Sequence, residues 1–173
     1  MDIGLFALHA LPGVLFMGHG AQKLFGLLGG YGIEGTGGFM ESLGLRPGRL
    51  HATLAGSAEF FGGLLLALGL FVPLAAAVLI ATMVTASLTA HRGKGIWNQD
   101  GGIELPLVYS TIAFGLAAVG AGDWSLDSAF GFDLAGAEWA FGALGAGLVG
   151  GFGALASGRL GHKGGSPAHP QGA

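Results

Sequence analysis

The sequence has no cysteine among its 173 residues. This absence excludes disulfide bonds, zinc sites with cysteine ligands, iron–sulfur clusters bound by this chain and a catalytic thiol. Charge is also scarce, because Asp, Glu, Lys and Arg make up only 10% of the chain, against about 25% in an ordinary soluble domain. That shortage argues against a soluble enzyme, and against disorder, which requires high charge and few apolar residues. The net charge of −3 provides no basic surface for nucleic acid.

Apolar residues and glycine make up most of the chain. Hydrophobic side chains account for 51% of the residues, and glycine alone contributes 37. The glycines follow no strict Gly-X-Y period, which excludes a collagen triple helix. In membranes, by contrast, small residues allow helices to approach one another closely. The composition therefore predicts an all-α integral membrane protein.

The hydrophobic stretches predict five membrane-spanning helices, since one span needs about 20 mostly apolar residues. We expect spans at residues 3–25, 50–70, 72–90, 103–120 and 134–157. The uncharged run over residues 60–90 would form one helix about 46 Å long, too long for one crossing. The turn sequence GLFVP therefore divides it, with Pro73 opening the next helix.

No basic residue precedes the first apolar stretch, which favours a retained helix over a cleaved signal peptide. In the fifth span, Gly147 and Gly151 form a GxxxG pair, a spacing typical of close helix packing.

The charges predict how these spans are oriented. With five spans, every basic residue lies on one side of the membrane, and the other side carries acidic residues but no Lys or Arg. By the positive-inside rule the basic side is cytoplasmic, so we expect the N-terminus outside and the C-terminus in the cytoplasm. Residues 159–173 are expected to form a disordered cytoplasmic tail. The basic residues are Lys23, Arg46, Arg49, Arg92, Lys94, Arg159 and Lys163.

Ionisable residues inside the spans are the candidate functional residues, because a charge at membrane depth is costly. His19 and Lys23, four residues apart, share one face of the first span, and Gln22 lies beside them. Glu59 lies two turns inside the second span, where a carboxylate must be paired, hydrogen-bonded or protonated. Lys23 is its natural partner. A buried ion pair that fixes the register of two helices explains these two residues as well as a functional site does.

A second group of polar residues lies at the ends of the spans. His91 closes the third span, Glu104 opens the fourth, and His51 begins the second. All three fall in the same cytoplasmic half as the residues above, so we expect one inner-leaflet polar pocket to gather most of them. For His51 and His91 an ordinary polar span end is a sufficient explanation, which is not true of Glu59 or His19. His9, in the outer half of the first span, is expected to pack or form hydrogen bonds rather than bind a ligand.

The expected pocket suits more than one chemistry. Two histidines and two carboxylates can bind a metal, but no His-x-x-His or Glu-x-x-His pair is present and no spacing supports a bis-histidine haem, so no metal is expected. A quinone needs an apolar cleft, a His or Lys donor for a carbonyl oxygen and a carboxylate that relays protons, and it fits these residues best. A transporter would also use buried Glu and His, but no inverted repeat supports one. The candidate catalytic residues are Glu59 and His91, and the candidate quinone-binding residues are His19, Gln22, Lys23 and Glu104.

Four sequence motifs occur in order along the first three quarters of the chain. They are GHGAQKLFG at 18–26, AEFFGGLLLALGL at 58–70, GIELPLV at 102–108 and GAGDWSLD at 120–127, with His91 between the second and third. In this order they resemble the DoxX family of small bacterial and archaeal membrane proteins over about residues 5–130. The resemblance implies a four-helix membrane domain at 1–130, to which 131–158 adds a C-terminal transmembrane helix. The family's motif positions carry over to His19, Gln22, Lys23, Glu59 and Glu104.

The function that this resemblance implies is a redox function. The family takes its name from a subunit of an archaeal thiosulfate:quinone oxidoreductase, and some members are linked to oxidative-stress complexes in membranes. The resemblance therefore implies a membrane subunit of a quinone-linked oxidoreductase in the bacterial inner membrane, with soluble redox partners on its cytoplasmic side. Because cysteine is absent, sulfur chemistry would need a partner or act directly through the quinone.

Two alternatives stay open at this point. One is a non-catalytic membrane scaffold that anchors soluble redox or stress-response enzymes through its basic loops. The other is a carrier of small solutes or lipids, for which the polar pocket would be the binding site. The glycine-rich surface is compatible with a homo-oligomer within the lipid bilayer. No nucleic-acid partner is expected.

Overall fold

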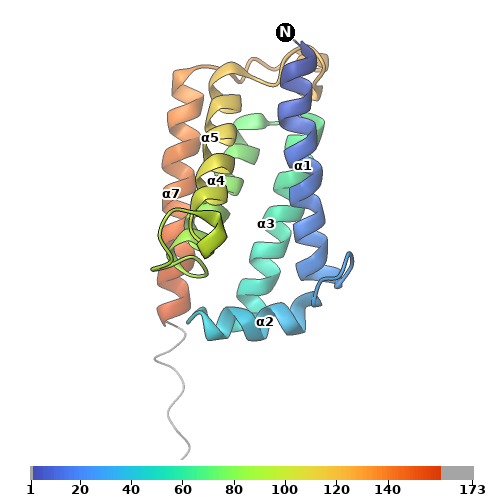
Figure 1. Cartoon of the computed structure of the whole chain (residues 1–173). Coiled ribbons are helices and arrows are strands. Elements are labelled where there is room, and N and C mark those ends of the chain that lie inside the picture. Colours follow the sequence, from blue (N-terminus) through green and yellow to red (C-terminus); the bar gives the residue numbers. More distant parts are fainter. Residues whose placement is uncertain (1, 161–173) are drawn as a thin grey trace, which may run out of the picture.

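Helices form the regular structure of residues 2–160, which are the residues that the computed structural model describes. Five of them run side by side along the molecule (Figure 1), namely α1 (Asp2–Phe25), α3 (Gly48–Leu68), α4 (Val72–Leu88), α5 (Glu104–Val119) and α7 (Ala137–Leu160). By length and apolar composition α1, α3 and α7 can each cross a membrane, and α4 and α5 are shorter apolar helices. The predicted all-α membrane fold, a four-helix bundle with a fifth helix, is therefore confirmed.

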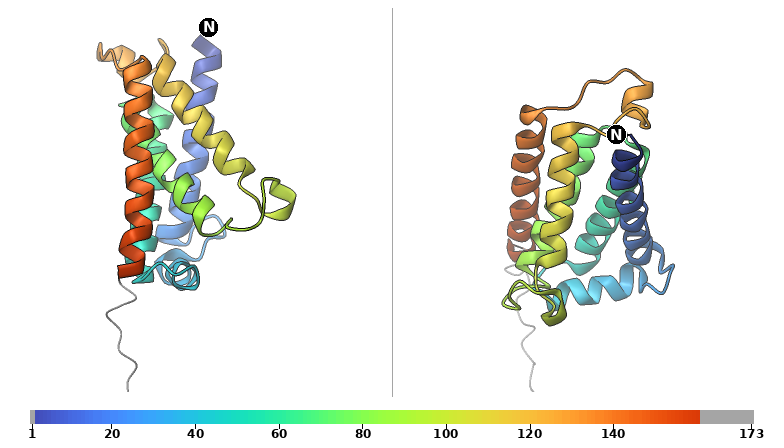
Figure 2. Two further views of the ribbon diagram at one scale, coloured as in Figure 1. Left: turned by 90° about the vertical axis from the view of Figure 1, so that its left-hand side faces the viewer. Right: turned by 45° about the horizontal axis from the view of Figure 1, so that its top comes forward.

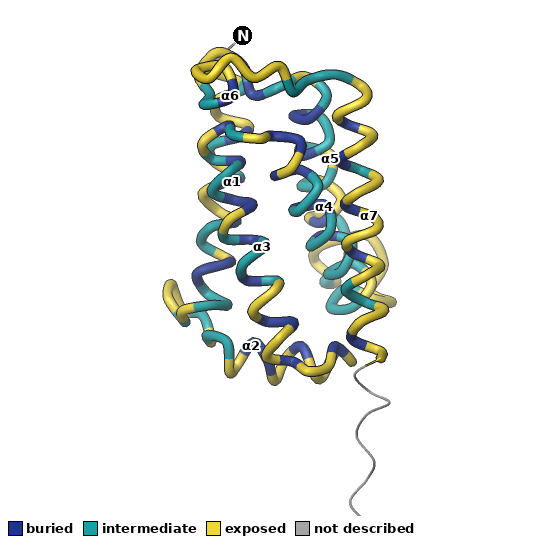
Figure 3. The backbone as a smooth tube through the Cα atoms, turned by 180° about the vertical axis from the view of Figure 1, so that it is seen from behind, coloured by how far each residue is buried: buried dark blue, intermediate teal, exposed yellow. Residues whose placement is uncertain are grey.

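The five long helices form two groups. α1 packs closely against α3, whereas α4 packs against both α5 and α7. The views in Figure 1 and Figure 2 show the first two as a pair and the other three as a layer beside it. α3 and α4 are joined by a tight turn at one end of the bundle and diverge toward the other end (Figure 3). The two groups are consequently farthest apart at the end where α2 (Gly32–Ser42) lies across the base.

The tight turn between α3 and α4 follows the predicted GLFVP sequence. Gly69 ends α3 in the left-handed conformation, with a φ of 58°, which glycine adopts without steric cost. Pro73 lies in the first turn of α4, where its missing N–H would have no helical partner. The buried carboxylate of Asp127 accepts hydrogen bonds from the N–H groups of Phe71 (2.8 Å) and Val72 (3.1 Å). It thereby caps the N-terminus of α4, where the helix dipole also favours negative charge.

The helix α2 was not expected, because the sequence predicts only a loop between the first two spans. Four of its 11 residues are glycine, and glycine disfavours helix formation by about 1 kcal/mol per residue. Tertiary contacts outweigh that preference. A Cβ atom at Gly48 would lie 2.1 Å from the carbonyl oxygen of Gly37, so the two backbones meet directly. The Gly48 N–H also donates a hydrogen bond of 3.0 Å to Glu41 Oε1, which fixes α2 to the start of α3.

Small residues attach the fifth long helix, α7, to α4. A Cβ atom at Gly147 would lie 2.6 Å from Ile80 Cγ2, and one at Gly151 would lie 2.7 Å from Val84 Cγ1. Both glycines are buried, while the outward face of α7 is exposed along its length (Figure 3). The predicted role of this GxxxG pair in close helix packing is confirmed.

The ends of the predicted spans differ from the helices by a few residues. The largest difference concerns the fifth span, which begins at Ala137 and continues to Leu160. The first two residues of the predicted tail at 159–173 therefore belong to α7, which corrects that prediction. Residues 161–173, including Lys163, lie outside the described residues.

The two ends of the bundle differ in charge. Every Lys and Arg within residues 2–160 lies toward the end that carries α2. The opposite end carries the short helix α6 (Leu126–Ala129) and the acidic residues Asp123, Asp127 and Asp133. Within the described residues, the Lys and Arg side chains therefore lie at one end of the bundle, as the positive-inside rule requires of a membrane protein.

Candidate functional site

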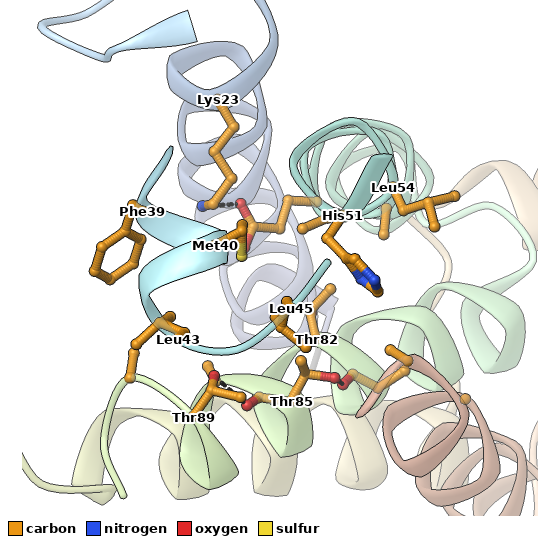
Figure 4. Close-up of a pocket in the computed structure, with 18 of the residues that line it drawn as sticks. Lys23, Phe39, Met40, Leu43, Leu45, His51, Leu54, Thr82, Thr85 and Thr89 are labelled. Atoms are coloured by element: carbon orange, nitrogen blue, oxygen red, sulfur yellow. Dashed lines mark hydrogen bonds and ion pairs between the residues drawn. The ribbon is translucent and has the colours of Figure 1, made fainter. Parts of the chain in front are cut away.

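A cavity of about 450 Å³ lies between the two groups of helices, near the end that α2 closes (Figure 4). This volume falls within the range of about 300–1,000 Å³ that is typical of small-molecule sites. Residues from α1, α2, α3, α4 and α7 line the cavity, and most of their side chains are apolar. The larger apolar side chains on its walls are Phe39, Met40, Leu43, Leu45, Leu54 and Val78.

Threonines provide the polar surface of α4 that faces the cavity. Thr82, Thr85 and Thr89 are three or four residues apart, which places them on one side of the helix. Each hydroxyl donates a hydrogen bond of 2.7 to 2.9 Å to a backbone carbonyl one turn earlier in α4. Because the hydroxyl hydrogens are used in this way, these oxygens can only accept hydrogen bonds from a ligand.

An ion pair between α1 and α3 forms one polar part of the cavity wall. Lys23 Nζ donates to Glu59 Oε2, and the two side chains are 24% and 10% exposed. Glycines bring the two helices close enough for this contact. A Cβ atom at Gly20 would lie 2.4 Å from the backbone nitrogen of Phe60, and one at Gly56 would lie 3.1 Å from Lys23 Cβ. The pairing of Lys23 with Glu59 expected from the sequence is present.

His51 provides a third polar part of the wall; it belongs to the polar group expected in the inner leaflet, but not to the six candidate site residues. It is 4% exposed, and within residues 2–160 its Nε2 is the one buried side-chain nitrogen or oxygen without a hydrogen-bond partner. Figure 4 shows its ring projecting into the space between α3 and α4. An unsatisfied buried polar group costs about 1–3 kcal/mol, and within residues 2–160 no group of the protein offsets this cost for His51 Nε2.

A signal for His51 was present in the sequence. His51, Ala55 and Glu59 are spaced by four residues, so they lie along one face of a helix, and all three line the cavity. Polar side chains are common at the start of a span, and His51 was explained in that way. Its position on the same helix face as Glu59 was therefore not used to predict the site.

His19 and Gln22 lie outside the cavity lining, contrary to the expected single pocket. His19 is exposed, and its Nδ1 donates a hydrogen bond of 3.2 Å to Gln22 Oε1. Gln22 Nε2 in turn donates to the carbonyl oxygen of Leu28 at 3.1 Å. The two side chains therefore hold the connection that follows α1. The expectation failed because sequence spacing fixes a residue's depth but not the direction in which its helix face points.

His91 and Glu104 are also absent from the cavity lining. His91 Nδ1 donates a hydrogen bond of 2.6 Å to the carbonyl oxygen of Gly101. Glu104 Oε2 accepts one of 2.9 Å from the N–H of Asn98, in the 3₁₀ turn η1 (Asn98–Asp100). Both residues thus brace the loop between α4 and α5, which projects from the bundle (Figure 2). Of the six predicted site residues, the structure brings Lys23 and Glu59 together in the cavity and places the others elsewhere.

His9 has the packing role expected for it. The side chain is 1% exposed, Nδ1 donates a hydrogen bond of 3.0 Å to the carbonyl oxygen of Leu66, and Nε2 lies 3.3 Å from that of Trp124. His9 therefore ties α1 to α3 and to the loop that carries α6, at the end of the bundle opposite the cavity.

The residues that build the cavity coincide with a family signature. Residues 4–92, just over half of the chain, match the family model of DoxX. The chain belongs to the DoxX family. The matched segment covers nearly all of α1 and the whole of α2, α3 and α4, and it supplies all the lining residues except Gly150 and Ala154 of α7. No curated protein and no solved structure matches the chain. Together, the family and the apolar helices identify a multi-pass membrane protein.

Proposed function

We propose that the cavity binds a lipid-soluble quinone and that this DoxX protein is the membrane subunit of a quinone-linked oxidoreductase. The observation that carries the proposal is an apolar cavity between membrane helices in which the groups available to donate a hydrogen bond to a ligand are Lys23, paired with Glu59, and the imidazole of His51, whose Nε2 has no partner within residues 2–160. An apolar chamber with a few polar groups is the usual form of a site for a small apolar ligand. The ion pair and the imidazole suit the two carbonyl oxygens of a quinone, which accept hydrogen bonds.

The chemistry of the site supports proton transfer to such a ligand. Reduction of a quinone to a quinol consumes two electrons and two protons. In the ion pair Glu59 is a carboxylate, so for each of the two protons it would first take up a proton from the α2 end and then pass it to the reduced quinone, and the ammonium of Lys23 would stabilise the carboxylate that remains. The electrons would come from a soluble redox partner that docks at the end carrying α2, where the Lys and Arg residues lie. His91, which braces a loop outside the cavity, has no part in this step.

The proposed orientation follows from the same charges. The basic end would face the cytoplasm of a bacterium, with the N-terminus on the outer side of the inner membrane. Because the chain has no cysteine, single cysteines can test this in intact cells. Ser42→Cys, at the basic end, should resist a membrane-impermeant thiol reagent, and Ser128→Cys, exposed at the opposite end, should react with it. The reverse pattern would invert the topology and place the quinone site in the outer leaflet.

Quinone binding is tested with the purified protein in lipid nanodiscs. A benzoquinone and a naphthoquinone with isoprenoid tails are titrated, and binding is followed by native mass spectrometry and by the shift in Tm. Ala58→Phe puts a ring into the cavity and should weaken binding at least tenfold, whereas Ala146→Phe on the exposed face of α7 is the matched control. Equal affinity in both variants would remove the cavity as the quinone site.

Other outcomes of this titration distinguish the alternative functions. Binding of phospholipid or another apolar solute without any quinone would indicate a carrier. A cavity that binds neither, together with retained capture of soluble redox enzymes, would indicate a non-catalytic scaffold. For the oxidoreductase, Glu59→Gln should lower quinone reduction by the assembled complex while binding survives, because the amide cannot relay a proton.

A further inference from the structure

The cavity reaches the molecular surface at residues of α2, α3 and α7. Phe39 of α2 (52% exposed), Leu54 of α3 (55% exposed) and the exposed Gly150 of α7 all line it, and we take the side between α3 and α7, at Leu54 and Gly150, as the opening toward the bilayer. Toward the base the opening is closed, because Leu155 of α7 packs against the buried cluster that contains Leu45 and Ala52. Both flanking helices are long and apolar enough to span a membrane, so we expect this side of the bundle to face lipid.

Small residues keep this opening wide. Gly150 has no side chain, and a Cβ atom there would already lie 3.2 Å from the Cβ of Ala81 on α4. Ala81 and Ala154 complete this part of the wall. A larger side chain at Gly150 would therefore press on Ala81 and enter this part of the cavity wall.

His51 is the polar group next to this opening. It precedes Leu54 by three residues, which places the two side chains on neighbouring positions of α3, and Figure 4 shows them side by side. The Lys23–Glu59 pair is a separate group, since Glu59 lies two turns further along α3. Lys23 and Glu59 satisfy each other, whereas Nε2 of His51 has no partner within residues 2–160.

We infer that the quinone enters between α3 and α7, that one of its carbonyl oxygens accepts a hydrogen bond from His51 Nε2, and that its tail remains in the opening at Leu54 and Gly150. This inference rests on the proposed quinone function. It adds the route by which the quinone enters the cavity and the hydrogen bond that His51 donates to it. A tail that leaves through a lipid-facing opening stays in an apolar solvent, so binding requires no space for it inside the 450 Å³ cavity. The same contact removes the unsatisfied buried nitrogen of the ligand-free protein.

Variants of His51 separate a contact with the ligand from a structural role. His51→Leu should weaken quinone binding by about tenfold, the factor that one lost hydrogen bond represents. The Tm of the ligand-free protein should stay unchanged or rise, because the variant removes a buried polar atom that has no partner. His51→Gln retains an N–H group at a similar distance from the backbone and should bind within about threefold of the wild type. If His51 had a structural role instead, the Tm of the ligand-free protein would fall in both variants.

The route is tested by closing the opening. Gly150→Trp should weaken binding of the tailed quinones at least tenfold. Gly153→Trp is the matched control, since Gly153 is exposed on the same helix and a Cβ there would meet nothing within 4 Å. Unchanged binding in Gly150→Trp would overturn the proposed route, and unchanged binding in His51→Leu would overturn the proposed contact. If the wild type binds neither quinone, the proposed function itself fails, so the failures are distinguishable.

Discussion

The Lys23–Glu59 ion pair allows a prediction about stability, because its two charges differ in exposure. The Glu59 side chain is 10% exposed and that of Lys23 is 24% exposed. Lys23→Met would leave a carboxylate in the cavity wall without its partner, and breaking a buried pair costs about 3–5 kcal/mol. Glu59→Gln would leave a lysine in the last turn of α1, where its long side chain can extend to the membrane interface. We therefore expect the free energy of unfolding to fall by about 3 kcal/mol in Lys23→Met and by about 1 kcal/mol in Glu59→Gln.

The double variant Lys23→Met/Glu59→Gln provides the decisive comparison. It removes both charges and puts side chains of similar size in their place, a change that is often close to neutral for a buried ion pair. Its loss should be about 1 kcal/mol, well below the sum of the single losses. The resulting coupling energy of about 3 kcal/mol would be at the upper end for residues in contact.

These free energies can be measured by reversible unfolding of the purified protein in mixed micelles. The SDS fraction is raised at neutral pH, and the loss of helix is followed by far-UV circular dichroism. Equal losses in the two single variants would contradict the argument from exposure. A double variant that loses the full sum would show that the two charges do not interact, and the reasoning would be refuted.

Three further predictions concern the packing that positions the cavity. Asp127→Ala should lower the free energy of unfolding by about 3 kcal/mol in the same assay, because two N–H groups at the start of α4 lose their charged acceptor. Gly151→Leu should lower it by at least about 2 kcal/mol, because the new side chain collides with Val84, while Gly153→Leu on the open face of α7 should leave it unchanged. His9→Leu should cost about 1 kcal/mol, because the buried hydrogen bond from His9 Nδ1 to the carbonyl oxygen of Leu66 is lost at the end opposite the cavity; unaltered stability would contradict its packing role.

Much of the fold could be predicted from hydropathy and spacing. The five long helices follow from apolar stretches near the length of a membrane crossing, and the turn before Pro73 follows from the length limit on a single helix. The contact of Gly147 and Gly151 with α4 follows from their spacing on one helix face. The helix α2 could not be predicted in this way, because its glycines disfavour a helix and tertiary contacts, chiefly with α3, stabilise it.

The candidate site was predictable only in part. Lys23 and Glu59 could be paired from the sequence, because a carboxylate inside a span requires a partner and one cation lies at a suitable depth. His91 and Glu104 lie near the same depth, but their side chains turn to the loop between α4 and α5. Depth along the membrane can be counted in residues. The direction of a side chain around the bundle axis depends on how the helices pack.

The sequence by itself determined that this is a helical membrane protein of the DoxX family, with its Lys and Arg at one end and a charged pair inside its bundle. These properties depend on composition, on residue order and on the high cost of charge in an apolar medium. The tertiary structure alone decided where the helices separate, that α2 and α7 enclose the space between them, and that His51 faces it without a partner. Such features depend on contacts between residues far apart in the chain, and local sequence patterns do not predict these contacts.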